Sequence, residues 1–487
     1  MDNKQKVVSN LIWRFMERFG SQLVSFVVQI VLARMLDPAV FGTVAKVTII
    51  TTILLVFVDS GMANSLIQKK DPDDLDFSSV FYFNVAFCLV LYALLFAAAP
   101  AISRMYGEAQ LAPVIRVLGL TVVVAGVKNV QQAYVSKTLQ FKRFFFATLG
   151  GTLLSAAVGI GMVMRGFGVW ALVAQQLTNV TVNTLILWLT VGWRPKLMFS
   201  FVRLGALLSY GWKLLVSGLL DTLYNKLREI IIAVFYTDAD LAYYNRGMTY
   251  PNLLVENINA SIDSVLLPVL SAEQDHKNQV RGMTRRAIRI STYVMMPLMM
   301  GLAVCAEPLI RLLLTEKWLP CVPYLRIFCF SYAFYPLHTA NLNAIKAMGR
   351  SDMFLKLEII KKMLGVVVLL LTMPYGVYVM ALSLLFTSVM AQLINSWPNA
   401  KLLDYAYGQQ LLDMLPAIGL SCLMGLAVFP IQLFGWSDWV TLPVQVVLGA
   451  AIYIAGSVIF KLDSFNYLLS IFKKLLRRRA QGDARRR

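Results

Sequence analysis

The sequence has little charge for its length and almost no histidine. Charged residues make up 15% of its 487 residues, hydrophobic residues make up 58%, and there are 2 histidines. A soluble chain of this size needs far more polar surface to stay dissolved. Two histidines also leave no basis for a histidine metal centre, so we expect no metal site.

Paired cysteines and nucleotide-binding motifs are absent as well. The cysteines have no paired spacing and most lie inside apolar runs, where a buried thiol behaves as a small hydrophobic group: Cys88, Cys305, Cys321, Cys329 and Cys422. The sequence contains neither a GxxxxGK[ST] loop nor an HExxH motif. We therefore predict no cofactor, no ATP-driven transport within this chain and no enzymatic activity.

Long apolar runs are the main feature that is present. Runs of roughly 20 residues recur along the chain, for example at 43–61, 79–99 and 440–460, and each can cross a ~30 Å hydrocarbon core as a helix. The sequence predicts an all-α polytopic membrane protein with about 14 transmembrane helices. Their centres are expected near residues 23, 52, 89, 123, 154, 179, 221, 257, 301, 334, 363, 386, 422 and 450.

Lysine and arginine are unevenly distributed between alternate loops. The loops predicted on the side of the termini carry Lys69, Lys70, Lys137, Lys142, Arg143, Arg194, Lys196, Arg203, Lys277, Arg281, Arg285, Arg286, Arg350 and Lys401. The opposite loops carry Arg34, Arg104, Arg165 and Lys317. By the positive-inside rule, both termini are predicted to be cytoplasmic. The basic tail at 473–487 is interpreted as an anchor against anionic membrane lipids, and no nucleic-acid partner is expected.

A short internal similarity suggests a duplication. Residues 31–46 align with residues 231–246, and each segment ends a helix with polar side chains, makes a tight turn and starts another long helix. We expect two six-helix lobes related by an internal repeat around a central cavity, at 1–200 and 201–400. Two additional helices would follow at 401–463, and then a basic cytoplasmic tail at 464–487. Such repeats are typical of alternating-access transporters.

The first predicted helix carries polar side chains on one face. At ~100° per residue, these side chains occupy about 140° of the helix: Arg14, Glu17, Arg18, Ser21, Gln22, Ser25 and Gln29. We predict that Arg14, Glu17, Arg18, Gln22 and Gln29 line a cavity. The alternative for Arg14, Glu17 and Arg18 is a position in the cytoplasmic headgroup layer, because this helix is longer than the membrane requires.

The helix near residue 221 repeats this pattern. Lys213, Asp221 and Arg228 share one arc with Ser209, Ser217 and Tyr224. An ionisable group at the centre of a membrane helix costs at least ~2.5 kcal/mol unless it is paired or hydrated. Two separate helices that confine such groups to one face therefore predict a shared, water-filled cavity.

Other polar positions are expected to belong to the same cavity. Lys46 and Arg246 occupy equivalent places in the two halves, where snorkelling to the headgroups is the alternative to substrate contact. Glu256 and Asp263 share one helix face with Asn252 and Asn259. His338 is interpreted as a buried bundle histidine, with a proton relay as the alternative.

An excess of arginine and lysine in a cavity favours an anionic substrate, because these side chains bind phosphate oxygens. A cation-coupled multidrug antiporter is a rival, but it would show the opposite charge bias. A membrane glycan polymerase or ligase needs a large periplasmic loop, whereas the predicted loops are short. A structural scaffold would not require polar faces on two helices.

Several segments, in order over residues 1 to 400, resemble the polysaccharide-transporter branch of the multidrug/oligosaccharidyl-lipid/polysaccharide exporter superfamily, the Wzx-type flippases. These segments are LARMLDPAVFG (32–42), DSGMANSLIQKKD (59–71), LQFKR (139–143), SVLLPVLSAEQD (264–275), TEKWLPCVPYLRIF (315–328) and AIKAMGR (344–350). Two of them, within 59–71 and 315–328, are similar to colanic-acid-type members.

This resemblance implies a flippase of the bacterial inner membrane that moves undecaprenyl-pyrophosphate-linked oligosaccharide to the periplasmic leaflet by alternating access. The product would serve lipopolysaccharide, capsule or exopolysaccharide biosynthesis. The resemblance also implies coupling to H+ or Na+, no cofactor, and glycan polymerase or assembly proteins as partners.

Overall fold

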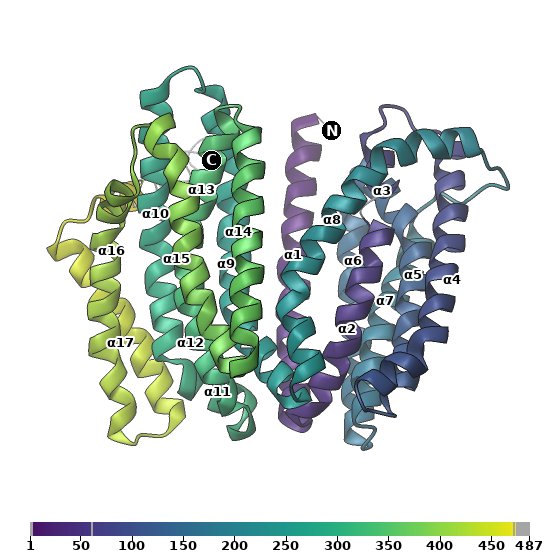
Figure 1. Cartoon of the computed structure of the whole chain (residues 1–487), viewed down its shortest axis with the longest axis horizontal. Helices are drawn as coiled ribbons and strands as arrows, with labels where there is room; N and C mark the ends of the chain where they lie inside the picture. The colour runs from purple at the N-terminus through teal and green to yellow at the C-terminus, as the bar shows by residue number, and fades with distance from the viewer. Residues whose placement is uncertain (1–2, 60–61, 471–472, 474–487) are drawn as a thin grey trace, which may run out of the picture. The chain divides into compact units, whose positions relative to one another are not determined.

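The computed structural model describes residues 3–59, 62–470 and 473 (Figure 1). Within the first helix, the side chains of residues 3–12, 14, 15 and 17–19 lie outside the described residues, and so does the side chain of Tyr210. The backbone of Arg14, Glu17 and Arg18 is therefore placed in a helix, whereas their side chains are not described.

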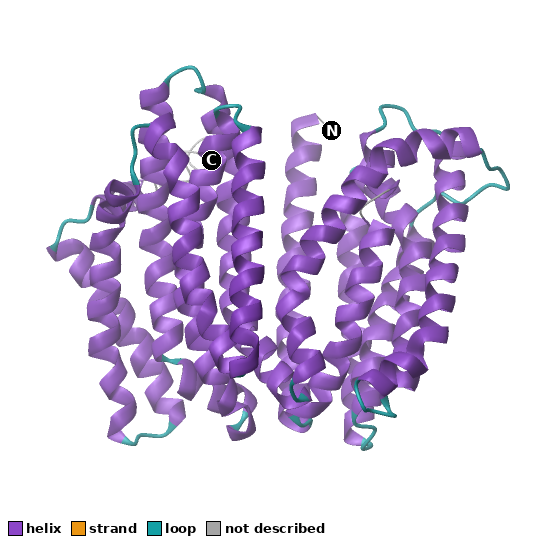
Figure 2. Ribbon diagram, in the orientation of Figure 1, coloured by secondary structure: helices purple, strands orange, loops and turns teal. Residues whose placement is uncertain are grey.

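Every regular element of the described residues is a helix, and short loops join the helices (Figure 2). The predicted all-α class is confirmed. The chain divides into two compact units, residues 1–242 and 243–487. The predicted division into four segments, with boundaries after residues 200, 400 and 463, stays a prediction.

The first unit is built from eight helices and the start of a ninth. These are α1 (Asn3–Met35), α2 (Pro38–Asp59), α3 (Met62–Gln68), α4 (Asp74–Met105), α5 (Leu111–Lys137), α6 (Phe141–Met164), α7 (Val169–Thr190), α8 (Phe201–Phe235) and the first residues of α9 (Asp238–Ala272).

The second unit continues α9 and adds α10 (Lys277–Val304), α11 (Ala306–Leu314), α12 (Val322–Ala333), α13 (Tyr335–Ala347), α14 (Ser351–Thr372), α15 (Val377–Leu402), α16 (Tyr407–Val428) and α17 (Asp438–Ile459). Short 3-10 turns occupy Glu316–Cys321, Met373–Tyr375 and Phe429–Phe434. Residues 463–470 form a further helical segment after α17.

The helix centres predicted from the sequence lie inside the observed helices, with one exception. Each centre lies inside a long helix except residue 334, which lies between α12 and α13. Pro336 has no N–H to continue the ladder of α12, and Phe334 instead caps α12 by donating its N–H to Tyr332 O. Among the described residues, nine helices are long and apolar enough to cross a membrane. The count of about 14 stays a prediction.

Small residues allow the helices of the first unit to pack closely. α6 lies against α7, where a Cβ on Gly151 would come within 2.9 Å of Asn179 O. A Cβ on Gly159 would meet the Gln175 side chain at 3.0 Å. Small residues at helix contacts are typical of membrane bundles, because van der Waals contact drives association there.

The corner between α1 and α2 has the same local geometry as the corner between α8 and α9. One helix ends at Met35 and the next begins at Pro38, while the other pair ends at Phe235 and begins at Asp238. This local match agrees with the alignment of residues 31–46 on 231–246. The internal repeat over whole lobes stays a prediction.

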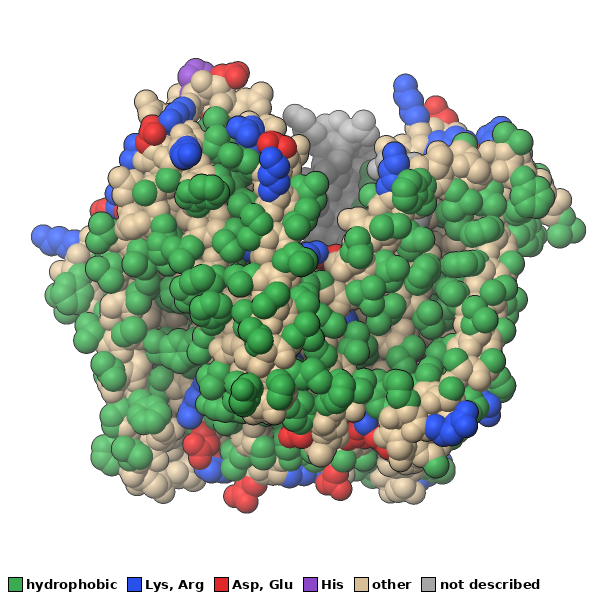
Figure 3. Space-filling view, in the orientation of Figure 1, with side chains coloured by type: hydrophobic (Ala, Val, Ile, Leu, Met, Phe, Trp, Pro, Cys, Tyr) green, Lys and Arg blue, Asp and Glu red, His purple; other side chains and the backbone are tan. Residues whose placement is uncertain are grey.

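Charged side chains gather toward the ends of the helices within each unit, and apolar side chains cover the middle (Figure 3). In the first unit, contacts bring the basic loops together at one end, since Lys137 Nζ donates to Ile67 O at 2.9 Å and Lys196 pairs with Asp74 at 2.5 Å. We call this the basic end of the first unit. In the first unit, the basic loops predicted for one side of the membrane therefore lie together in space.

Candidate functional site

The polar face of α1 is only partly described. Gln22 is half-buried and Gln29 is exposed, while Leu32 and Ala33 near the end of α1 are buried in the unit. The predicted roles of Arg14, Glu17 and Arg18 fall on side chains that lie outside the described residues. The five predicted cavity positions of α1 therefore stay a prediction.

The polar face of α8 presents charge at the protein surface. Lys213 and Asp221 are exposed and Arg228 is half-buried. Asp221 Oδ2 accepts a hydrogen bond of 3.1 Å from Asn225 Nδ2, one turn further along. Charged groups exposed this way on a helix of 35 residues require water rather than lipid around them.

The opposite face of α8 carries an ion pair that the sequence analysis missed. Lys226 Nζ lies 2.7 Å from Glu229 Oε1, and Glu229 is buried. Opposite charges three residues apart on a helix are a recognisable signal for such a pair. Lys226 and Glu229 therefore pair with each other on the face of α8 that lies opposite Lys213 and Arg228.

Lys46 of α2 is buried, 3% exposed, and lies between two carboxylates. Its ammonium forms ion pairs with Glu108, in the turn after α4, and with Asp238, at the start of α9. Thr43 Oγ1 also donates to Asp238 Oδ2 at 2.5 Å, and the Lys46 ammonium lies 5.0 Å from the centre of the Tyr106 ring. The charge of Lys46 is therefore matched inside the unit, and its predicted substrate contact stays a prediction.

Gly42 makes this corner possible. A Cβ at Gly42 would lie 1.9 Å from Asp238 O, so α2 and the start of α9 touch through their backbones. A backbone contact this close admits only glycine. Gly42 aligns with Ala242 in the internal similarity, but the contact between the two corners was not predicted from the sequence.

Arg246 of α9, the aligned position in the second unit, has a different environment. It is 7% exposed, and its guanidinium lies 4.9 Å from the centre of the Trp318 ring. Trp318 is completely buried and belongs to the segment 315–328 that carries the family resemblance. Gly247 allows this packing, because a Cβ there would lie 2.8 Å from Leu325 N. Lys46 and Arg246 are both buried, although the sequence analysis considered snorkelling as the alternative.

The polar face of α9 contains the other predicted acids. Glu256 is exposed and accepts from Asn252 Nδ2 at 2.7 Å, while Asp263 accepts from Asn343 Nδ2 of α13 at 2.6 Å. Neither amide atom of Asn259 has a hydrogen-bond partner among the described residues, although both are buried. Buried polar atoms of this kind are commonly satisfied by water. The predicted substrate roles of Glu256 and Asp263 stay predictions.

His338 lies inside the second unit, where its Nδ1 is 3.0 Å from Asn395 Nδ2. A second buried amide network is centred on Asn341, which donates to Gln410 Oε1 at 2.8 Å and accepts from Asn399 at 2.6 Å. Buried amides with partners stabilise one arrangement of a bundle. This environment agrees with the interpretation of His338 as a bundle histidine.

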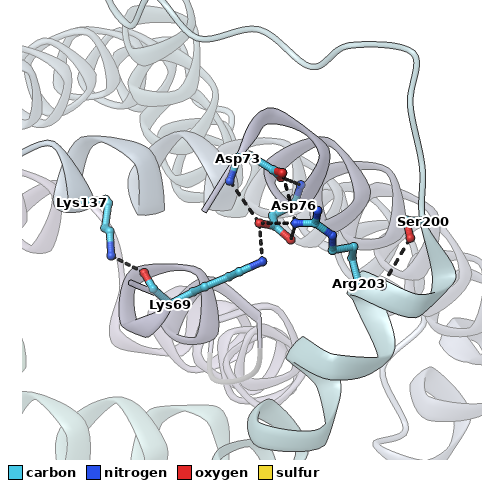
Figure 4. Close-up of polar contacts among 6 residues, drawn as sticks. All are labelled: Lys69, Asp73, Asp76, Lys137, Ser200 and Arg203. Atoms are coloured by element: carbon cyan, nitrogen blue, oxygen red, sulfur yellow. Dashed lines mark hydrogen bonds and ion pairs between the residues drawn. The ribbon is translucent and has the colours of Figure 1, made fainter. Parts of the chain in front are cut away.

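At the basic end of the first unit, Asp76 is fully buried and holds two cations (Figure 4). Its carboxylate is 2.5 Å from Lys69 Nζ and 3.4 Å from Arg203 Nη1, at the start of α8. Asp73 caps α4 by accepting the Asp76 N–H at 3.0 Å, and Asp76 accepts the Asp73 N–H at 3.1 Å. This capping box is the reason that a buried carboxylate can occupy this position.

Hydrogen bonds from neighbouring elements complete this cluster. Lys137 at the end of α5 donates to Lys69 O, and Ser200 caps α8 by accepting the Arg203 N–H at 3.4 Å (Figure 4). The Ser200 N–H in turn donates to Ser79 Oγ of α4 at 3.0 Å. The Asp76 cluster therefore anchors the start of α8, and Asp238 at the Lys46 corner anchors the chain that follows its end.

No group of three histidine, cysteine, aspartate or glutamate residues arranged to hold a metal ion occurs among the described residues. The described cysteines are free thiols. The candidate functional site consists of the polar faces of α8 and α9 and the charge clusters around Lys46 and Asp76.

The fold matches solved structures over most of the chain. The lipid II flippase MurJ, in an inward closed conformation, superposes with a TM-score of 0.73 at 14% identity, covering 92% of this chain and 98% of that chain. An inward-facing multidrug resistance MATE family transporter of the MOP superfamily gives a TM-score of 0.61 at 14% identity, covering 78% and 94%. This chain therefore shares its fold with these two proteins.

Sequence comparison adds the family. A family described as "Polysaccharide biosynthesis protein" matches residues 31–323, so the chain belongs to this family. The chain is 22% identical over 348 residues to the succinoglycan biosynthesis transport protein ExoT of Rhizobium meliloti (strain 1021), covering 72% of this chain and 70% of ExoT. It is 23% identical over 372 residues to the lipopolysaccharide biosynthesis protein WzxC of Escherichia coli (strain K12), covering 75% and 74%. The predicted family resemblance is confirmed.

Proposed function

We propose that this protein is a flippase that moves undecaprenyl-pyrophosphate-linked oligosaccharide repeat units across the bacterial inner membrane for surface polysaccharide biosynthesis. Family membership and the MurJ-like fold support transport of a lipid-linked glycan. The proposal includes about 14 spans in two lobes related by a repeat, alternating access between them, and no chemical step on the substrate.

The charged face of α8 is the observation in the first unit that carries this proposal. Lys213 and Asp221 are exposed although α8 is a long helix of a membrane protein. Such a face is stable only in contact with water, so we assign it to an aqueous path for the glycan and its pyrophosphate. Arg228 would bind phosphate oxygens bidentately, and Lys213 would add a point charge.

The two ends of α8 are held differently from its middle. Asp76 binds Arg203 at the start of the helix, and Asp238 belongs to the Lys46 corner beyond its end. These clusters hold the two ends of the helix in the first unit, and the proposed path runs along its middle. Arg14, Glu17 and Arg18 of α1 and Gln22 and Gln29 complete the proposed path on the strength of their sequence pattern.

The short loops argue against a glycan polymerase or ligase. Among the described residues of the first unit, the turns at the end that holds Glu108 comprise residues 36–37, 106–110, 165–168 and 236–237. None of them has room for a catalytic domain. A multidrug antiporter of the same fold would need deep unpaired acids, whereas Asp238 and Glu229 are both bound to lysines.

The proposal also includes orientation and energy supply. The positive-inside rule places the basic end of the first unit in the cytoplasm, together with both termini. Coupling to H+ or Na+ is part of the proposal, with Glu17, Asp59, Asp221 and Asp263 as the acids to be tested. Glycan polymerase or assembly proteins would receive the translocated product.

The test is to delete the gene in its native host and measure lipid-linked repeat units on each side of the inner membrane. Deletion is expected to abolish the surface polysaccharide and to accumulate repeat units on the cytoplasmic side. Purified protein in proteoliposomes is expected to make a lipid-linked oligosaccharide accessible to an external glycosidase. Intact polysaccharide after deletion, without accumulation of repeat units, would contradict the proposal.

Variants of α8 test the assigned path. Lys213→Ala and Arg228→Ala are each expected to lower the initial flipping rate about five- to thirtyfold, since each removes a phosphate-binding charge worth ~1–2 kcal/mol. The matched control is Arg165→Ala, because Arg165 is an exposed arginine in the turn after α6. Equal rates for all three variants would remove α8 from the path even if the protein flips lipid.

A further inference from the structure

A groove in the second unit combines arginines with apolar walls. Arg285, Arg286 and Arg289 lie in the first half of α10, and the helical segment 463–470 after α17 lies across them. Ser464 and Tyr467 line the side of this cavity that faces the three arginines. A neighbouring cavity shares Arg289, Asp463 and Ser464, and it is lined further on by Leu412, Pro416, Phe460 and Leu462. The two together form one groove with a basic head and an apolar extension.

A nearly buried carboxylate fixes two of the arginines. Asp413 of α16 accepts from Arg285 Nε at 2.6 Å and Nη2 at 2.8 Å, and from Arg289 Nε at 2.9 Å. Tyr405 donates to the same carboxylate at 2.7 Å. One negative charge thus orients two guanidinium groups whose side chains remain 48% and 34% exposed. The pair keeps a net positive charge and free N–H donors.

A third arginine adds charge that no carboxylate of the described residues neutralises. Arg286 is exposed and its guanidinium lies 5.4 Å from the centre of the Tyr467 ring, a contact that orients the side chain across the groove. Lys461 stands exposed at the rim. Asp463, the acid at the rim, is 89% exposed and 3.6 Å from Arg289 Nη1, too long for a hydrogen bond and open to replacement by a stronger anion.

The groove lies beside the end of α17, a helix long and apolar enough to cross a membrane. α17 ends at Ile459, and Phe465 and Leu468 of the segment 463–470 pack into the apolar cluster of Tyr293, Leu420 and Tyr453. Asn466 and Tyr467 of the same segment are exposed. A short amphipathic helix at the end of a membrane span lies in the interface, where tyrosine is favoured.

We propose that this groove binds the phosphate headgroup of an anionic membrane phospholipid, with Arg286 and the Asp413-oriented pair Arg285 and Arg289 on the phosphate and the acyl chains along Leu412, Pro416 and Phe460. Guanidinium groups are suited to phosphate oxygens, and basic pockets between membrane helices on the cytoplasmic side bind such headgroups. The apolar extension favours a lipid over a soluble phosphate. None of the residues of this site belongs to the proposed transport path.

The test uses the full-length protein in nanodiscs that contain equal amounts of phosphatidylglycerol and phosphatidylcholine. Native mass spectrometry after gentle release is expected to show retained phosphatidylglycerol in preference to phosphatidylcholine. Arg286→Ala is expected to lower the apparent affinity for phosphatidylglycerol about fivefold, since one surface arginine contributes ~1 kcal/mol to binding an anionic lipid. Arg286 is exposed, so its removal leaves the bundle intact.

The matched control is Arg281→Ala, which removes an arginine from the same helix outside the groove and is expected to leave retention unchanged. Equal loss in both variants would reduce the effect to nonspecific surface charge and overturn the site. Retention of phosphatidylglycerol unaffected by Arg286→Ala would also overturn it.

Two further arms identify the source of the phosphate. Inorganic pyrophosphate at millimolar concentration is expected to displace little phospholipid, since it cannot occupy the apolar extension. In nanodiscs that also contain a lipid-linked pyrophosphate oligosaccharide, phosphatidylglycerol is expected to remain bound. Its replacement by the pyrophosphate lipid would overturn the phospholipid assignment in favour of the transported substrate.

Discussion

The Thr43 hydroxyl donates a 2.5 Å hydrogen bond to the Asp238 carboxylate, which joins the start of α2 to the start of α9 across 195 residues. Lys46 forms an ion pair with the same carboxylate. The corner between α1 and α2 is thus tied to the corner between α8 and α9. The ends of α1 and α8 each lie one short turn away from this contact.

Loss of the lysine is expected to destabilise this corner. Lys46→Met leaves Glu108 and Asp238 close together without their cation and should cost about 3 kcal/mol. The measurement is thermal unfolding of the purified protein in detergent. The double variant Lys46→Met/Asp238→Asn should recover part of the loss, and strict additivity of the two single effects would argue against the pair.

A side chain at Gly42 is expected to disrupt the same contact. Gly42→Ala would place a methyl group 1.9 Å from Asp238 O, and a backbone atom cannot move away as a flexible side chain can. We expect a loss of roughly 2–3 kcal/mol in the free energy of unfolding or a lower folded yield. Gly161→Ala in α6 is the control, because nothing lies within 4 Å of a Cβ there. Equal stability of the two variants would contradict the close approach.

Removal of the buried carboxylate at the basic end is expected to loosen α8. Asp76→Ala leaves Lys69 and Arg203 facing each other and breaks the capping box of α4, with an expected cost of about 3 kcal/mol. Arg203→Ala should cost less than about 1 kcal/mol, since Arg203 is 42% exposed and Asp76 keeps Lys69. The stability of both variants is measured by thermal unfolding and by the protease sensitivity of the 191–200 loop. A larger effect of Arg203→Ala would reverse this ranking.

Acid is expected to weaken the cap of α4. The Asp76 N–H that donates to Asp73, with Arg203 nearby, holds the pKa of Asp73 below its usual range. A carboxylate whose pKa is lowered by folding stabilises the protein at neutral pH, and this contribution is lost as the pH falls below about 4. Asp73→Asn keeps a capping oxygen but does not titrate. The unfolding temperature of this variant should depend less on pH between about 5 and 3 than that of the wild type. The difference in the free energy of unfolding should be less than about 1 kcal/mol, because Asp73 is exposed.

The aromatic cover of Arg246 gives a further prediction. Trp318→Ala removes a completely buried ring and the cation–π contact with Arg246, and should cost roughly 3–5 kcal/mol. Trp318→Phe retains an aromatic face and should cost clearly less. Thermal unfolding separates the two variants. An equal loss would mean that ring volume, rather than an aromatic face over Arg246, is what this position requires.

The helices were predictable because hydropathy is a local property. Apolar runs placed nearly every helix, and the exception at residue 334 depends on Pro336, which interrupts the hydrogen-bond ladder between α12 and α13. The exposed positions of Lys213 and Asp221 also follow from helical periodicity, since both lie on one arc of α8.

The partners of the charged residues were not predictable in the same way. Lys46 and Arg246 align in the sequence and occupy the same place in a helix, yet Lys46 is neutralised by two carboxylates and Arg246 is covered by Trp318. Glu108 and Asp238 lie far from Lys46 in sequence, Trp318 lies far from Arg246, and none of the three carries a periodic signal. Asp413 was likewise missed as the partner of Arg285, and Tyr467 was missed as the partner of Arg286.

The amino-acid sequence by itself determined the membrane class, the helical architecture, the clustering of basic loops and the family, because each depends on composition, hydropathy or short motifs that are read along the chain. The tertiary structure alone decided which charges are neutralised internally, as at Lys46 and Asp76, and which remain exposed in a groove, as at Arg286. Neutralisation requires an opposite charge within a few ångströms, and only folding brings residues from distant helices that close together.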